Sequence, residues 1–180
     1  HFIKRINSHF ESQYTIAVNL SARQFKDQNI IKLIRESIIS ARISPAELDL
    51  EVTETMLMGD IEEAIKHMNA LKGLGVQLSI DDFGTGLASH NYLRELPVDY
   101  VKIDGTFITD IHKNRNDFAM ARSINDLAHF LGQETIAESV ENDLIIEQLR
   151  KIGVDFIQGW GVGMPKLLAD VTEELSSLEK

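Results

Sequence analysis

The stretch Ser79-Ile80-Asp81-Asp82-Phe83-Gly84-Thr85-Gly86 places two adjacent acids directly after an apolar run, and two glycines follow them. The run that precedes them, Gly75–Ile80, predicts a buried strand with Asp81 and Asp82 at its C-terminal end. Adjacent carboxylates repel each other, and a divalent cation offsets this repulsion because Mg²⁺ and Mn²⁺ prefer oxygen ligands. The alternative is a turn that ends the strand and leaves both acids exposed to solvent.

The rest of the chain alternates short apolar runs with longer amphipathic segments. The predicted strands are 15–20, 48–53, 76–80, 100–103, 134–137 and 156–157. The predicted helices are 1–12, 30–41, 61–74, 117–131 and 142–152, and 170–180 forms a final helix or a solvated tail. Glycines 75, 132 and 153 mark three helix ends. Strands that alternate with helices predict a parallel sheet.

Polar residues lie at or just after the C-terminal end of every predicted strand. They are Asn19, Glu51, Glu54, Asp81, Asp82, Lys102, Asp104, Glu138, Glu141 and Gln158. In a parallel (β/α)₈ barrel the C-terminal ends of the strands converge on one face, where such residues form a site. Six strands are predicted here, so we expect a TIM-like barrel whose first two strands precede residue 1. An open sheet of six strands is the structural alternative.

Composition limits the classes of function. With 180 residues, of which 43% are hydrophobic and 26% charged, the chain is expected to form a single soluble domain over residues 1–180. Its net charge of −10 argues against binding a DNA or RNA polymer, although not against a small phosphate-bearing ligand held through a metal. The chain has no cysteine, no apolar run that approaches a membrane span and no visible signal peptide. We therefore expect a cytoplasmic domain, with a membrane anchor on a longer parent chain left open.

The carboxylates and the Asn19 amide oxygen could hold one or two divalent metals for the hydrolysis of a phosphoester. Lys102 could hold the attacking water or stabilise charge on a phosphoryl oxygen, and Glu138 could act as general base. Glu51 is predicted to be a metal ligand, because it lies in a mostly apolar run and a buried acid without a partner is unfavourable. In a second reading, Lys102 forms a Schiff base as in barrel aldolases.

Several of these residues also have structural readings. Asn19 could cap the helix turn that follows it, and Glu141 could be an acid at the start of a helix. Trp160 could stack on a base or pack as an ordinary aromatic residue. The six histidines lack ligand spacing and are predicted to lie on the surface.

Seven segments of the chain together resemble the EAL domain family of cyclic-di-GMP phosphodiesterases. In order they are Val18-Asn19-Leu20-Ser21, Leu50-Glu51-Val52-Thr53-Glu54, Asp81–Gly86 with Tyr92-Leu93 behind it, Leu96-Pro97-Val98-Asp99, Lys102-Ile103-Asp104, Ala137-Glu138-Ser139-Val140-Glu141 and Gln158-Gly159-Trp160. The resemblance covers nearly the whole chain. It implies a (β/α)₈ barrel that hydrolyses cyclic-di-GMP to linear pGpG with Mg²⁺ or Mn²⁺.

The resemblance also assigns roles to individual residues. The metal-binding positions match Asn19, Glu51, Asp81, Asp82 and Glu138, and the catalytic positions match Lys102 and Glu138. Gln158 and Glu141 are assigned to the support of the active site, and Glu54 to anchoring the loop after the two acids. The family further implies a homodimer and sensory or GGDEF domains on the parent chain.

The chain departs from the family pattern at a few positions. The Glu-Ala-Leu signature, which carries a further metal ligand, is absent from residues 1–180. Ser139 stands where the family has glycine, Trp160 where it has tyrosine, and Gly163-Met164-Pro165 where it has Gly-Lys-Pro. These departures leave open a second function, a cyclic-di-GMP receptor without catalysis, and we expect residues 1–180 alone to be impaired.

Overall fold

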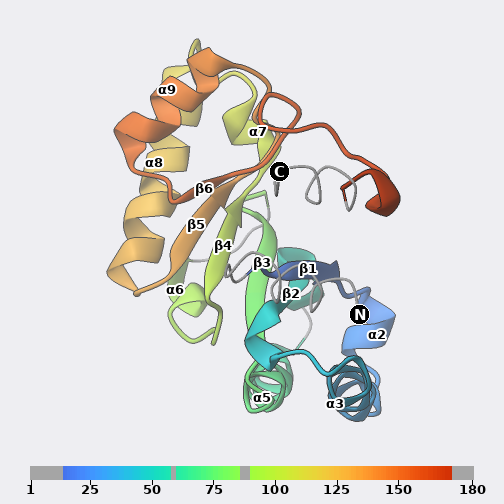
Figure 1. The fold of residues 1–180 in the computed structure, drawn as a ribbon. Coiled ribbons are helices and arrows are strands. Elements are labelled where there is room, and N and C mark those ends of the chain that lie inside the picture. The colour runs from blue at the N-terminus through green and yellow to red at the C-terminus, as the bar shows by residue number, and fades with distance from the viewer. Residues whose placement is uncertain (1–13, 58–59, 86–89, 172–180) are drawn as a thin grey trace.

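The computed structural model describes residues 14–57, 60–85 and 90–171, and these residues contain one parallel sheet. Its strands follow the sequence order β1 to β6, so each strand pairs with its neighbour in the chain (Figure 1). They are β1 (Ile16–Asn19), β2 (Leu48–Thr53), β3 (Gln77–Phe83), β4 (Tyr100–Ile103), β5 (Glu134–Ala137) and β6 (Phe156–Ile157). The predictions for β2, β4, β5 and β6 are confirmed residue by residue. β3 continues beyond the predicted end at Ile80 and includes both acids.

Four long helices connect the strands. They are α3 (Ile30–Ala41), α5 (Ile61–Lys72), α8 (Arg115–Phe130) and α9 (Asp143–Ile152). Each was predicted, with ends that differ by no more than two residues. The predicted helix 1–12 and almost all of the predicted segment 170–180 lie outside the described residues.

Five short elements lie near the strand ends or lead into a strand, and the sequence pattern does not predict them. They are α2 (Ala22–Phe25), α4 (Glu54–Leu57), α6 (His90–Leu93), α7 (Gly105–Ile108) and the 3₁₀ turn η1 (Pro45–Glu47). A single helical turn is too short to show a 3.6-residue period, which explains why they were missed. Ser21, and not Asn19, caps α2 through its side chain, so the capping alternative for Asn19 is wrong.

The two faces of the sheet differ in chemistry. Leu50 and Val52 of β2, Leu78 and Ile80 of β3, and their counterparts on β4 join the apolar core under the helices. The alternate residues point to the opposite face, because side chains alternate along a strand. That face carries buried polar groups, including the Asp49 carboxylate, which accepts a hydrogen bond of 2.5 Å from the Ser79 hydroxyl.

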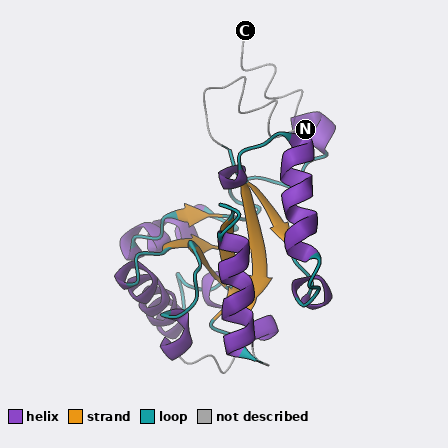
Figure 2. Cartoon of the chain, turned by 90° about the horizontal axis from the view of Figure 1, so that it is seen from below, coloured by secondary structure: helices purple, strands orange, loops and turns teal. Residues whose placement is uncertain are grey.

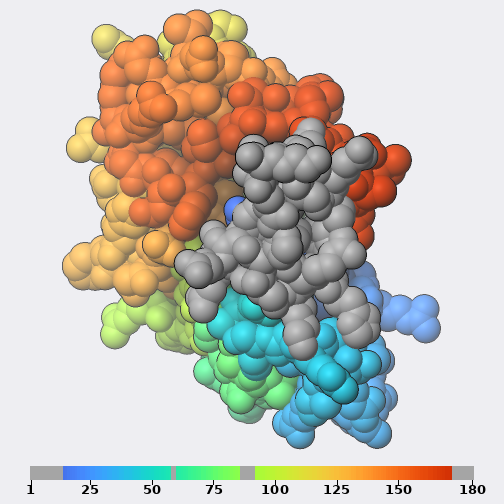
Figure 3. All heavy atoms as spheres, viewed as in Figure 1, coloured from blue at the N-terminus to red at the C-terminus, as the bar shows by residue number. Residues whose placement is uncertain are grey.

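The sheet is twisted, with helices packed beside its strands (Figure 2). It does not close in the described part of the chain, since β1 and β6 are its two outer strands. The strand order and the helices on one face are those of a TIM-like barrel that falls short of closure. In the space-filling view, the later strands and helices form the upper part of the molecule and α3 and α5 the lower part (Figure 3). No helix of the described residues is long and apolar enough to cross a membrane.

A polar network ties the N-terminal ends of β5 and β6 to α8, at the opposite end of the sheet from the predicted site. The Asp155 carboxylate accepts hydrogen bonds from the Thr135 backbone amide at 2.8 Å and from the His129 ring at 2.7 Å. The Thr135 hydroxyl also donates to the Asn125 side chain at 2.6 Å. Burial opposes the ionisation of Asp155, but the hydrogen bonds from His129 and Thr135 outweigh it and lower its pKa.

We expect Asp155→Asn to destabilise the fold at pH 7 and to lose this effect in acid. A carboxylate with a lowered pKa in the folded state stabilises the fold above its ordinary pKa of 3.8, and this contribution is lost as the pH falls through the lower folded value. Urea unfolding of the variant and of the unmodified chain between pH 7 and pH 3 measures the difference. A difference that is the same at both pH values contradicts this account.

Candidate metal centre

An irregularity in β3 brings the two adjacent acids to the same site. Ile80 pairs with Val101 and Phe83 with Ile103, so β3 uses one more residue than β4 over this span. Asp82 has a φ of +56°, in the left-handed region that non-glycine residues seldom adopt. In a regular strand Asp81 and Asp82 would face opposite sides, and this bulge turns both toward the C-terminal edge of the sheet.

Lys102 lies at the centre of the candidate site. Its ammonium group contacts Glu138 at 2.7 Å, Glu51 at 3.0 Å and Asp81 at 3.0 Å, and its side chain is only 4% exposed. These acids come from β2, from β3 and from the residue after β5, so the ends of four neighbouring strands converge. A buried lysine requires such partners, because an isolated charge in the interior is strongly unfavourable.

The electrostatics of the site keep Lys102 charged. Burial opposes the charged form, but hydrogen bonds to Glu138 and Asp81 and the charge of Glu51 outweigh it, so the pKa of Lys102 is raised. A Schiff base requires a neutral amine as its nucleophile. The raised pKa therefore argues against the aldolase reading of Lys102.

The acids of the site carry more negative charge than Lys102 neutralises. Burial, together with repulsion from Asp81 and Asp104, raises the pKa of Asp82. Burial also raises the pKa of Glu138, assisted by Asp81 and Asp82 and opposed by Lys102. Such raised pKa values mark carboxylates that gain from a further positive charge.

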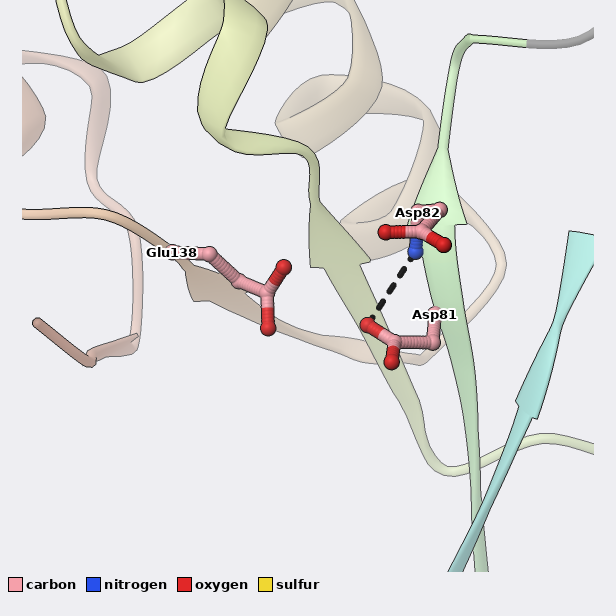
Figure 4. Close-up of side chains that lie close together, drawn as sticks. All are labelled: Asp81, Asp82 and Glu138. Carbon is pink, nitrogen blue, oxygen red and sulfur yellow. Dashed lines mark hydrogen bonds between the residues drawn. The ribbon is translucent and has the colours of Figure 1, made fainter. Parts of the chain in front are cut away.

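Asp81, Asp82 and Glu138 form a group that could hold a divalent cation. One oxygen from each lies within 4.8 Å of the others, and Glu138, just after β5, points across β4 toward the two aspartates of β3 (Figure 4). The Asp82 amide donates to the Asp81 carboxylate at 3.1 Å, which fixes the orientation of that carboxylate. A set of carboxylate oxygens fits Mg²⁺ or Mn²⁺.

The other predicted metal ligands lie beside this group. Glu51 is adjacent to the group of Asp81, Asp82 and Glu138, because it contacts the Lys102 ammonium group that also binds Asp81 and Glu138. Asn19, at the end of β1, is the register partner of Glu51, and its side chain is exposed. Asn19 thus lies on the correct edge of the sheet, but no hydrogen bond of its side chain is seen among the described residues.

Gln158 and Glu141 lie on one wall of an adjoining pocket. This pocket has a volume of about 460 Å³ and extends from Glu138 along the chain after β6. Trp160 and Pro165 form its apolar part, and the Trp160 side chain is 68% exposed. Trp160 is therefore not a packed core aromatic. Glu141 precedes the cap residue of α9, so it is not an acid of the first helical turn.

Glu54 lies behind the site and contacts the chain that follows the two aspartates. Its carboxylate is fully buried and accepts hydrogen bonds from the Gly84 amide at 3.0 Å and from the Tyr92 hydroxyl at 2.9 Å. Burial raises the pKa of the Tyr92 phenol, and its hydrogen bond to Glu54 and the charge of Glu54 raise it further. Glu54 thus links α4 to both sides of the segment 86–89, which is not described.

Asp104 and Tyr92 contribute to the site, although the sequence assigned neither of them a role in it. Asp104 follows Lys102 by two residues, and its negative charge helps to raise the pKa of Asp82. Its position at a strand end was the available signal. Tyr92 belongs to one of the segments that resemble the family, but nothing in the sequence links it to Glu54. The prediction that all histidines lie on the surface is wrong for His67 and His112, which are half-buried.

Comparison with known proteins identifies the family to which this chain belongs. The family model of the EAL domain matches residues 1–165, and the chain belongs to the EAL domain family. It is 37% identical over 172 residues to "Cyclic di-GMP phosphodiesterase PdeB" of Shewanella oneidensis, covering 96% of this chain and 20% of that protein. The chain thus spans about a fifth of the length of the curated relatives that it matches.

Solved structures share the fold over most of the chain. A structure described as "PaMucR Phosphodiesterase, c-di-GMP complex" superimposes with a TM-score of 0.88 at 33% identity, covering 93% of this chain and 68% of that one. The EAL domain of Mycobacterium smegmatis DcpA gives a TM-score of 0.90 at 27% identity and covers 98% of this chain and 79% of that one. These likenesses confirm the predicted TIM-like fold class.

We expect Lys102→Met to destabilise the chain by about 3–5 kcal/mol in the absence of divalent ions, because it leaves buried carboxylates without their counter-charge. Added Mn²⁺ should raise the thermal midpoint of this variant more than that of the unmodified chain, since the ion then supplies the missing positive charge. Lys72→Met is the control, because Lys72 pairs with Asp99 outside the site and is about one-third exposed. Equal Mn²⁺ responses in all three proteins would contradict the role of Lys102.

We expect Glu54→Ala to release the Gly84 amide. Removing a buried acceptor leaves the donors that it satisfied unpaired and costs about 1–3 kcal/mol. Amide hydrogen exchange at Gly84 should accelerate in this variant and stay close to the original rate in Tyr92→Phe, which removes only the other hydrogen bond. Unchanged exchange at Gly84 in Glu54→Ala would show that other contacts hold this segment.

Proposed function

We propose that this chain is the catalytic domain of a metal-dependent phosphodiesterase that hydrolyses cyclic-di-GMP to linear pGpG. The observation that carries the proposal is the convergence of Glu51, Asp81 and Glu138 on one buried lysine, beside Asp82 and an adjoining pocket. Relatives of the same family, among them PdeB and NbdA, are named cyclic-di-GMP phosphodiesterases.

The metal that we propose is Mg²⁺ or Mn²⁺, as one or two ions. Asp81, Asp82 and Glu138 would hold it, with Glu51 and Asn19 at the adjacent strand ends. A bound divalent ion supplies a water of lowered pKa and neutralises charge on a phosphoryl group.

The residues of the chain divide the remaining tasks. Glu138, whose pKa is raised, is suited to accept a proton from the attacking water near neutral pH. Lys102 already uses its three donors on carboxylates, so its principal role in this geometry is to orient Glu51, Asp81 and Glu138. Attack on phosphorus then breaks one bond to a ribose 3′ oxygen, which takes a proton as it leaves, and linear pGpG is the product.

Gln158 and Trp160 are proposed to contact the dinucleotide, since both lie on the pocket that extends from Glu138. The proposal includes a homodimer, a cytoplasmic location and sensory or GGDEF domains elsewhere on the parent protein. One relative, MucR of Pseudomonas aeruginosa, is named a bifunctional diguanylate cyclase and cyclic-di-GMP phosphodiesterase.

A second candidate function is a cyclic-di-GMP receptor that does not turn over its ligand. The observation that favours it is the backbone of Ser139, which has a φ of +54° directly after Glu138. A strained residue at this position could displace the carboxylate on which hydrolysis depends.

We expect the protein expressed from its complete gene to convert cyclic-di-GMP to pGpG with Mg²⁺ or Mn²⁺, and to stop when EDTA removes the metal. Glu138→Gln should lower turnover by about 100-fold or more, since it removes the proposed proton acceptor. Glu147→Gln is the matched control, because Glu147 pairs with Lys151 on the exposed face of α9. Chromatography of the products measures both.

Binding of cyclic-di-GMP without turnover by the unmodified protein, in the presence of either metal, would exclude the phosphodiesterase and support the receptor. A full loss of turnover in Glu147→Gln would show that the effect of Glu138→Gln is not specific to the site.

A further inference from the structure

The segment that carries Glu138 is held between glycines on two sides. After β5 the chain passes through residues 138–142, where the Val140 amide donates to the Gln158 carbonyl at 3.0 Å and the Gly161 amide donates to the Val140 carbonyl at 2.8 Å. A Cβ atom added to Gly159 would meet the Val140 amide nitrogen at 2.3 Å, and one added to Gly161 would meet the Glu141 carbonyl carbon at 2.4 Å. The backbone after Glu138 therefore has no room to move toward residues 159–161.

On its other side the segment contacts the start of α7. A Cβ atom added to Gly105 would lie 2.4 Å from the Ser139 hydroxyl oxygen and 2.8 Å from the Ser139 Cβ. Rotation of the Ser139 side chain could remove the first clash but not the second, because the Cβ position is fixed by the backbone. The space between α7 and the segment therefore accommodates one side chain, and here Ser139 supplies it.

This contact lies between two groups of the candidate site. Gly105 is three residues after Lys102 and one after Asp104, while Ser139 directly follows Glu138. The Glu138 amide donates to the Ile103 carbonyl at 3.2 Å, so the two segments remain adjacent up to the contact. A shift of Ser139 away from α7 would move Glu138 relative to Lys102 and to the two aspartates.

We propose that Gly105 and Ser139 form a matched pair that positions the Glu138 carboxylate in the metal group. A side chain fits at only one of the two positions, and glycine at 105 is what allows serine at 139. Gly105 is the positioning residue, because it leaves the space that the Ser139 side chain occupies, and neither residue is a metal ligand. The inference rests on the proposed function for its catalytic readout, and the metal group provides a readout that is independent of turnover.

A double-mutant cycle tests this pair in the protein expressed from its complete gene. The four proteins are the unmodified form, Gly105→Ala, Ser139→Gly and the double variant. For each, calorimetric titration measures the Mn²⁺ affinity, product analysis measures kcat and KM for cyclic-di-GMP, and thermal unfolding measures Tm. Gly73→Ala, at the C-terminal end of α5 with a φ of −61°, controls for adding a methyl group to a glycine outside the site.

We expect Gly105→Ala to lower the Mn²⁺ affinity and to lower kcat by about 10- to 100-fold, since a small misplacement of a catalytic group has effects of this size. Ser139→Gly should retain kcat and Mn²⁺ affinity within about twofold and a Tm no lower than the original, because glycine adopts φ of +54° without strain. The double variant should recover both the affinity and kcat to within about threefold of Ser139→Gly, because the added methyl group then has room.

Equal losses from Gly105→Ala in the serine and glycine backgrounds would overturn the pairing. A change in Tm without a change in Mn²⁺ affinity or kcat would show that the contact is only structural and would also overturn it. If the unmodified protein binds Mn²⁺ but does not hydrolyse cyclic-di-GMP, the proposed function fails, and the cycle in Mn²⁺ affinity still decides whether the pair positions Glu138.

Discussion

The neutralisation of buried carboxylates by Lys102 is the constraint on which the site depends. Three acids, Glu51, Asp81 and Glu138, lie within 3.0 Å of one ammonium group that is almost fully buried. Without that charge, the strand ends of β2, β3 and β5 would repel one another in a poorly solvated environment. The same arrangement leaves excess negative charge near Asp82. The carboxylates that Lys102 holds together at the C-terminal edge of the sheet are therefore also the groups that could bind a divalent ion.

The backbone around the site adopts unusual conformations that bring these side chains together. The bulge in β3 and the left-handed Asp82 allow adjacent residues to face one site, and the left-handed Ser139 turns the chain directly after Glu138. Glu54 then fixes the chain beyond the aspartates through Gly84 and Tyr92. Backbone conformations of this kind are unfavourable in isolation and persist because the surrounding contacts determine them.

Most regular elements of the fold could be predicted because each has a local signal. The strand β2 and the helix α3 show the hydrophobic periods of their structure over their full length, and their predicted bounds agree with the structure. The one-turn helices α4 and α7 have too few residues for a period. The end of β3 was placed too early, because charged residues at a strand end resemble a turn when the partner strand is unknown.

The sequence by itself determined the class of the fold, the family and the set of polar residues at the strand ends, because periodicity and residue type are properties of neighbouring positions in the chain. Only the tertiary structure decided which of these residues meet. It brings Lys102 to Glu51, Asp81 and Glu138, joins Tyr92 to Glu54, and leaves Asn19 exposed at the outer strand. Contacts of this kind depend on strand register, on a one-residue bulge and on the space left by Gly105, none of which a linear pattern encodes.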